Sequence, residues 1–229
     1  DEGLLQLDDR IVDLFTDECP STISDNLAAM TVRHLLTMTS GHREDTMPRL
    51  RREGAQWVNS ILAEPVDYRP GTHYVYDSGA SYLLSAALQS ATGERLLDYL
   101  TPRLFGPIGI VGATWGQCPA GIDYGGFGLS MTTEAVAAFG QFCLQRGVWD
   151  GHQIVSDKWI DAATRAQVVT ESENPDWALG YGYQFRPSRW GGYRAAGAFG
   201  QLCLVLPELA AVVVVTGGFD NAQRQLDTI

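Results

Sequence analysis

Apolar residues recur at helical spacing along most of the chain before Trp177, and typical capping residues bound the repeats. A serine or threonine that precedes such a repeat is a common helix N-cap, and a glycine or proline ends it. The pattern predicts helices over residues 31–41, 57–65, 78–93 and 132–147, and a short one about Trp159 after a Ser156 cap.

The predicted helix over residues 78–93 has its apolar positions on one face. Ser78 is its expected N-cap, and Gly93 lies beyond its end. The apolar positions that share one face of this helix are Ala80, Leu83, Leu84, Ala87 and Ala91.

The pattern changes after Trp177, where aliphatic and β-branched runs at Leu202–Leu206 and 211–216 predict an antiparallel hairpin. Residues 1–176 are therefore expected to be mainly helical, and residues 177–229 to hold strands and the start of a C-terminal helix. Helices followed by a terminal meander indicate an α+β fold, with a helical region packed on an antiparallel sheet. We expect residues 1–229 to form a single domain.

Composition narrows the classes of partner. The chain has 229 residues, of which 45% are hydrophobic and 10% aromatic, and this is enough for a sizeable core. Lys and Arg number 16 against 27 Asp and Glu, a formal net charge of −11. Nucleic acids and anionic membranes favour a basic face, so neither is an expected partner. No apolar run approaches the roughly 18 residues that span a bilayer. The sequence leaves localisation open, with a cytoplasmic location favoured.

Common catalytic and metal-binding motifs are absent. Gly128-Leu129-Ser130 is followed by Met131 and Thr132, so there is no G-x-S-x-G elbow. The histidines form no H-E-x-x-H motif, and the glycine-rich stretch 125–128 is interpreted as a turn before Ser130. No C-x-x-C pair occurs, which predicts buried, reduced thiols at Cys19, Cys118, Cys143 and Cys203. We expect neither a metal nor an organic cofactor.

Tyr76 has an unusual setting, because the Pro70-Gly71 turn and a short extended piece deliver it to the start of a helix. The positive end of the helix dipole favours a phenolate, so Tyr76 is a candidate general base if a lysine ammonium lies near it. The alternative is that Tyr74 and Tyr76 are aromatic core residues and Ser78 is a simple cap. Spacing alone favours this alternative.

Several blocks, in the same order along the chain, resemble the serine β-lactamase-related family. The blocks that carry the resemblance are 31–42 (TVRHLLTMTSGH), Pro70-Gly71 ahead of 76–79 (YDSG), 126–133 (GFGLSMTT) and 197–201 (GAFGQ). That family holds class C β-lactamases, penicillin-binding-protein-like DD-peptidases, esterases and 6-aminohexanoate-dimer hydrolases. The resemblance implies a β-lactamase/transpeptidase-like fold, truncated at both ends, and a mechanism through an acyl-enzyme.

The resemblance also implies roles for particular residues. Tyr76 matches the tyrosine of the Y-x-N motif, and Ser78 stands where the asparagine usually is, so both are expected to be catalytic, with Asp77 between them at the substrate. Gly197 matches the glycine of the strand motif, and the backbone N–H of Ala198 corresponds to an oxyanion-hole donor.

The positions before Gly197 depart from the family pattern. Ala195 stands where the family has a cationic or imidazole side chain, and Ala196 follows it. We expect both at the substrate. Arg194 is the one neighbouring cation that could replace the missing group, although an exposed arginine at a strand end is the commoner meaning. The departures at Ala195 and Ser78 favour an ester or amide substrate over a β-lactam.

The nucleophile motif of the family, S-x-x-K, is absent from the sequence. Lys158 is the only lysine, and Val155 stands three residues before it. We therefore expect a fragment whose parent is a serine hydrolase, with the serine and lysine upstream, acting on a small ester, amide or lactam. A non-catalytic binding or regulatory module, and a β-lactamase or DD-peptidase, are the alternatives.

Overall fold

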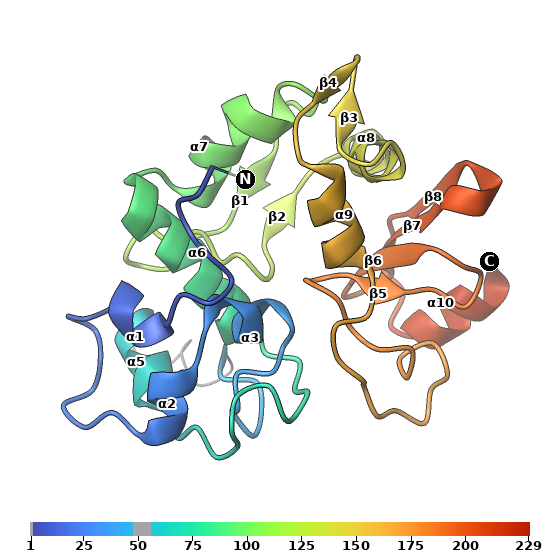
Figure 1. Ribbon diagram of the computed structural model, residues 1–229. Coiled ribbons are helices and arrows are strands. Elements are labelled where there is room, and N and C mark those ends of the chain that lie inside the picture. The colour runs from blue at the N-terminus through green and yellow to red at the C-terminus, as the bar shows by residue number, and fades with distance from the viewer. Residues whose placement is uncertain (1, 48–55) are drawn as a thin grey trace. The chain divides into compact units, whose positions relative to one another are not determined.

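The computed structural model describes residues 2–47 and 56–229, and the contacts among them divide the chain into two compact units (Figure 1). The helical unit consists of residues 2–101 and 113–130, and the sheet unit of residues 102–112 and 131–229. These boundaries differ from the change of character that the sequence places at residue 176. That residues 1–229 form one domain stays a prediction.

The helical unit is built from short helices around one long one. Its helices are α1 (Ile11–Leu14), α2 (Asp25–Ala29), α3 (Val32–Leu36), α5 (Trp57–Ala63), α6 (Ser78–Thr92) and α7 (Leu96–Leu100). The antiparallel strands β1 (Thr114–Trp115) and β2 (Leu129–Ser130) complete it. The helix expected over residues 31–41 ends at Leu36, because Met38 adopts a left-handed backbone conformation with φ of 58°.

Helix α6 begins one residue earlier than the sequence predicts. Its N-cap is Asp77, whose side chain accepts a hydrogen bond from the backbone N–H of Gly79, and Ser78 is already the first helical residue. The expectation that Ser78 caps the helix is therefore wrong. The other end is as predicted, since Gly93 takes the left-handed conformation with φ of 73°.

The first half of α6 is buried on more than its apolar face. Ser81 and Ser85 are buried, whereas Ala91, at the far end of the predicted face, is exposed. A Cβ added to Gly125 would lie 2.5 Å from the carbonyl oxygen of Ser81, and one added to Gly126 would lie 3.0 Å from the Cβ of Ser81. The glycine-rich turn therefore packs directly on the helix, and this close approach requires small residues on both sides.

The sheet unit contains a four-stranded antiparallel sheet in the order β5-β6-β7-β8. The strands are β5 (Arg186–Pro187), β6 (Tyr193–Gly197), β7 (Gln201–Leu206) and β8 (Ala211–Val215). Leu206 pairs with Ala211, and the 3₁₀ turn η2 (Pro207–Leu209) joins the two strands. The predicted antiparallel hairpin is confirmed.

Helices cover both faces of this sheet. Leu202, Leu204 and Leu206 of β7 form a buried cluster with Leu226 of α10 (Ala222–Thr228). On the other face lies α8 (Thr133–Leu144), which approaches so closely that a Cβ added to Gly140 would lie 2.7 Å from Cys203 Sγ. Successive side chains of β7 therefore pack against α10 on one face of the sheet and against α8 on the other. The predicted α+β architecture, with helices on an antiparallel sheet, is confirmed.

Smaller elements complete the sheet unit. They are the hairpin of β3 (Val148–Trp149) and β4 (His152–Gln153), helix α9 (Asp157–Thr164) with its predicted Ser156 cap, and the π-helical turn η1 (Thr101–Phe105). Helix α8 has the N-cap Thr132; its Cys143 is buried, and Val136 and Phe139 are half-buried.

Two expectations about the side chains can be checked directly. All four cysteines are free thiols, and three of them are buried, but Cys19 is half-buried. No helix in the described ranges is both long and apolar enough to cross a membrane.

Candidate functional site

Tyr76 is carried to the start of α6 by an extended segment that lies along the loop after α3. Backbone hydrogen bonds join the two: the Gly71 N–H donates to the Thr39 carbonyl at 2.9 Å, and the Val75 N–H donates to the Met38 carbonyl at 2.9 Å. The first two sequence blocks of the resemblance therefore form one substructure. Tyr76 is 47% exposed, so the interpretation that it is a core residue is wrong.

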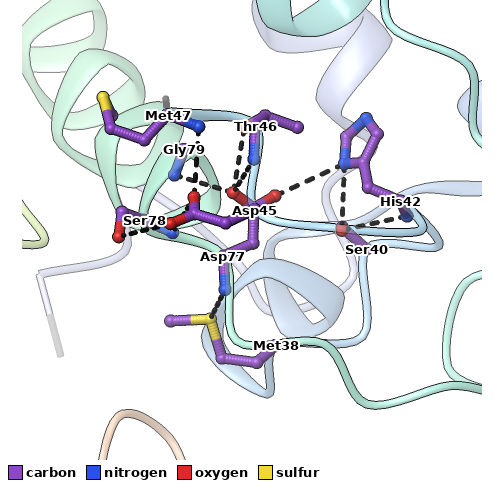
Figure 2. A network of polar contacts seen from close by, with 9 residues as sticks. All are labelled: Met38, Ser40, His42, Asp45, Thr46, Met47, Asp77, Ser78 and Gly79. Atoms are coloured by element: carbon purple, nitrogen blue, oxygen red, sulfur yellow. Dashed lines mark hydrogen bonds and ion pairs between the residues drawn. The ribbon is translucent and has the colours of Figure 1, made fainter. Parts of the chain in front are cut away.

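Asp77 holds this substructure together through hydrogen bonds to its buried side chain. Its side chain is fully buried, and its Oδ1 accepts hydrogen bonds from the Thr46 N–H at 3.0 Å, the Thr46 hydroxyl at 2.9 Å and the Gly79 N–H at 2.9 Å (Figure 2). A carboxylate so enclosed cannot reach a substrate, which corrects the expectation of a substrate contact. Asp77 instead ties the loop that contains Thr46 to the N-terminus of α6.

His42 lies on the other side of the same carboxylate. Its Nδ1 is 3.1 Å from Ser40 Oγ and 3.5 Å from Asp77 Oδ2, and the imidazole is almost fully buried (Figure 2). Burial disfavours the charged form of Asp77, but His42 and the donors of Thr46 outweigh it, so the pKa of Asp77 is lowered. We therefore treat Asp77 as ionised at neutral pH.

Asp45 is a second carboxyl group at the same helix end, and no sequence motif contains it. Its Oδ1 accepts from the Ser78 N–H at 2.9 Å and from the Met47 N–H at 3.1 Å, while its Oδ2 lies 3.3 Å from Ser78 Oγ (Figure 2). Burial raises the pKa of Asp45, and the neighbouring Asp77 adds to the rise. Asp45 and Ser78 are 33 residues apart in the chain, so no spacing rule links them.

The two carboxylates change the electrostatics expected at the start of α6. The N–H groups of Ser78 and Gly79, which were expected to favour a Tyr76 phenolate, donate to Asp45 and Asp77. A helix N-terminus whose first N–H groups already bind two carboxyl groups offers little further attraction to a phenolate. The expected contribution of the helix dipole to Tyr76 is corrected accordingly.

The strand motif lies in the sheet unit, at the turn between β6 and β7. Ala195, Ala196 and Gly197 pair with Cys203, Leu202 and Gln201. Ala196, Gly197 and Ala198 are exposed, and Ala195 is half-buried. In the turn that follows Ala198, Phe199 and Gly200 both have a positive φ, of 59° and 82°. The glycine suits that position, and the exposed turn leaves the Ala198 backbone accessible.

Arg194 has a different environment from the one expected. It is fully buried, and its guanidinium donates to the carbonyl oxygens of Pro187 and Asp176. Its carbon Cζ lies 5.4 Å from the ring centroid of Trp177. Burial lowers the pKa of Arg194 to about 10. The arginine is therefore neither exposed nor free to replace a substrate-binding cation; it holds β6 to β5 and to the loop at Asp176.

A cavity of about 290 Å³ in the helical unit adjoins the network at Asp45. The residues that line it are His42, Arg43, Glu44, Asp45, Thr46, Glu64, Pro65 and Asp67. Four carboxylates and one arginine make this surface acidic. Within the described ranges, however, no three His, Cys, Asp or Glu side chains are grouped so as to hold a metal ion.

The structure thus places the predicted site residues in two sets. Tyr76, Asp77 and Ser78 belong to the helical unit, and Arg194 and residues 195–198 belong to the sheet unit. Within the first set, Tyr76 is exposed and Ser78 half-buried beside Asp45. Within the second set, the alanines and Gly197 follow one another at the end of β6 and in the turn after it.

Solved structures with the same fold include several hydrolases and penicillin-binding-protein homologues. EstCE1, a hydrolase with promiscuous acyltransferase activity, matches with a TM-score of 0.76 and 17% identity over 99% of this chain and 78% of its own. A chain described as a 6-aminohexanoate-dimer hydrolase from Bacillus anthracis has a TM-score of 0.75 and 19% identity over 99% of this chain. This chain spans 65% of that protein's length.

A penicillin-binding protein homologue from Caulobacter crescentus gives a TM-score of 0.74 and 14% identity over 98% of this chain and 76% of its own. At these identities the likeness concerns the fold. No curated protein sequence matches the chain. The sequence profile of the family described as Beta-lactamase matches residues 1–228. The chain therefore belongs to the β-lactamase family, whose members are serine hydrolases.

Proposed function

We propose that these residues are part of a serine hydrolase that cleaves a small ester or amide through an acyl-enzyme. The observation that carries the proposal is Tyr76, exposed at the start of α6 on a segment that the buried Asp77 and the loop after α3 hold in place. An exposed tyrosine on so rigid a support suits a group that exchanges a proton with a reacting atom.

In this mechanism a serine Oγ attacks the carbonyl carbon of the substrate, and its proton passes by way of Tyr76 to the leaving oxygen or nitrogen as the bond to carbon breaks. Water then cleaves the acyl-serine by the reverse proton path. The Ala198 N–H stabilises the oxyanion in both steps. The residues of this chain supply the base and the oxyanion donor.

The nucleophile and its lysine are proposed to lie in residues that precede this segment in the parent protein. Two observations support this: the sequence contains no S-x-x-K, and it spans 65% to 78% of the structures described above. Because Asp45 and Asp77 already occupy the start of α6, the positive charge that a Tyr76 phenolate needs has to come from that lysine.

The proposed substrate is an ester or an amide rather than a β-lactam. β-Lactam recognition in the family uses a cation or imidazole where this chain has Ala195, and the neighbouring Arg194 is buried. Of the aromatic side chains near the strand motif, Tyr181 and Tyr183 are buried and belong to the core, whereas Trp190, 37% exposed, and Phe199, 65% exposed, offer apolar surface to an acyl group.

The test is labelling with a fluorophosphonate, which reacts with activated serines, followed by intact mass spectrometry. The natural full-length product should gain one adduct, whereas residues 1–229 alone should gain none. In the full-length protein, Tyr76→Phe removes one hydroxyl from an exposed side chain, so acylation should fall by about 100-fold or more while the melting temperature stays unchanged. Wild-type turnover in that variant would remove Tyr76 from the mechanism.

A binding module is the second candidate, favoured by the absence of S-x-x-K within these residues. If neither the full-length product nor the 229-residue chain is labelled, and no Ser-x-x-Lys precedes this segment in the gene, the fold serves binding alone.

A further inference from the structure

The starting observation is the direction of the hydrogen bond between Ser78 and Asp45. Asp45 Oδ1 is held by the N–H groups of Ser78 and Met47, at 2.9 and 3.1 Å, and this orients Oδ2 toward the Ser78 hydroxyl at 3.3 Å. In this contact the Ser78 hydroxyl donates and the carboxylate oxygen Oδ2 accepts. The proton of Ser78 is therefore directed inward.

What remains on the outer side of Ser78 is its oxygen, with lone pairs that can accept. The asparagine that Ser78 replaces in the Y-x-N motif offers separate donor and acceptor ends, so it can meet either kind of partner. Ser78, whose hydroxyl proton is donated to Asp45, offers a substrate only a hydrogen-bond acceptor. Two carboxyl groups lie behind it: Asp45, which accepts from its hydroxyl, and the buried Asp77, which is paired with His42.

We propose that Asp45 fixes Ser78 as a hydrogen-bond acceptor, so that the preferred substrates carry an N–H or O–H donor, and no carboxylate, on the acyl group next to Tyr76. This inference rests on the proposed hydrolase function and names its substrate class. Asp45 acts through Ser78 and is a positioning residue, whereas Ser78 is the residue that contacts substrate. The acidic lining of the adjoining cavity also disfavours substrates that carry a carboxylate on the acyl group.

The experiment uses the full-length protein and three 4-nitrophenyl esters. N-acetylglycine and N-acetyl-N-methylglycine esters differ in one N–H group, and the acetate ester reports hydrolysis as such. For the wild type, kcat/KM should be about five- to tenfold higher for the N–H ester than for its N-methyl partner, after correction for their rates of spontaneous hydrolysis. Ser78→Ala should reduce this ratio to about one.

Asp45→Asn is the decisive variant. Its carbonyl oxygen can still accept from the N–H groups of Ser78 and Met47, but its amide would donate to the Ser78 oxygen and free the hydroxyl proton to face outward. The ratio should then fall to one or invert. Asp67→Asn is the matched control, because it removes an acidic side chain from the same cavity without touching Ser78, and the ratio should stay at the wild-type value.

The outcomes separate the inference from the proposed function. If the wild type hydrolyses none of the esters, the hydrolase proposal fails. If it hydrolyses acetate but does not distinguish the matched pair, or if Asp45→Asn keeps the wild-type ratio, the inference is wrong and the hydrolase proposal stands. Should Asp45→Asn fail to fold, as judged by circular dichroism, an unchanged ratio in Ser78→Ala overturns the inference by itself.

Discussion

Replacing Gly79 by alanine is the sharpest test of the network beneath Tyr76. Alanine is the best helix former, and in an ordinary first helical turn this change would stabilise the protein by up to about 1 kcal/mol. Here the added Cβ would lie 1.9 Å from Thr46 Oγ1 and 3.1 Å from Asp77 Oδ1. The Thr46 side chain would have to rotate away, and its hydrogen bond to the carboxylate would break.

The magnitude follows from two costs. A hydrogen bond to a charged group contributes about 1.5–3 kcal/mol, and forcing an extra methyl into a packed site costs about 1–3 kcal/mol. After the helix gain, Gly79→Ala should lower the free energy of unfolding by about 2–4 kcal/mol. Thr46→Ala loses the hydrogen bond but removes the atom in conflict, so adding Gly79→Ala to it should cost far less.

Urea unfolding followed by circular dichroism measures all four members of this cycle. The expected coupling between Gly79→Ala and Thr46→Ala is about 1–3 kcal/mol in favour of the double variant. If Gly79→Ala alone is neutral or stabilising, the contact between Thr46 and α6 does not exist as described. Additive effects of the two substitutions would count equally against it.

Three further predictions concern groups elsewhere in the two units. Because folding lowers the pKa of Asp77, its ionised form contributes stability that is complete above the unfolded-state pKa of about 4 and is lost as the pH falls through the folded-state pKa. Asp77→Asn should therefore destabilise the protein at pH 7. In urea titrations at pH 3 the difference in stability between this variant and the wild type should be smaller. Burial raises the pKa of Cys143 to about 12 and of Cys203 to about 11, so at pH 8 a disulfide reagent should modify half-buried Cys19 and leave these two intact until urea is added; rapid modification of all thiols in the native protein would contradict their burial. Arg194→Lys should lower the free energy of unfolding by about 2–3 kcal/mol, since one ammonium cannot reach the two carbonyls that the guanidinium joins, and an unchanged urea midpoint would show that the arginine does not hold β6.

The sequence predicted the elements whose signals are local. Ser156 caps the helix that it was expected to cap, α8 follows Thr132 where a helix was predicted, and the hairpin of β7 and β8 follows from its aliphatic runs and the turn between them. The order of blocks along the chain was sufficient for the family. Tyr76 was found because the Pro-Gly turn and the helix start stand beside it in the sequence.

What the sequence could not predict depends on contacts between distant residues. Asp45 belongs to no sequence motif, and its hydrogen bond to Ser78 forms because the loop after α3 folds back on α6. The burial of Arg194 is set by the carbonyl of Asp176 and the ring of Trp177, so spacing suggested an exposed cation in its place. The cap moved from Ser78 to Asp77 because Thr46 supplies the remaining donors to that carboxylate.

The glycine turn that packs on α6 limits how the chain can fold while it is being synthesised. Residues 2–101 of the helical unit are synthesised first, but Ser81 and Ser85 stay uncovered until Gly125 and Gly126 have left the ribosome, with residues 102–112 of the other unit made in between. Folding of the helical unit therefore cannot be completed in step with its own translation. For the same reason, no single break in the gene separates the two units, and a recombinant N-terminal piece ending near residue 101 would expose a helix face shaped for a partner it lacks.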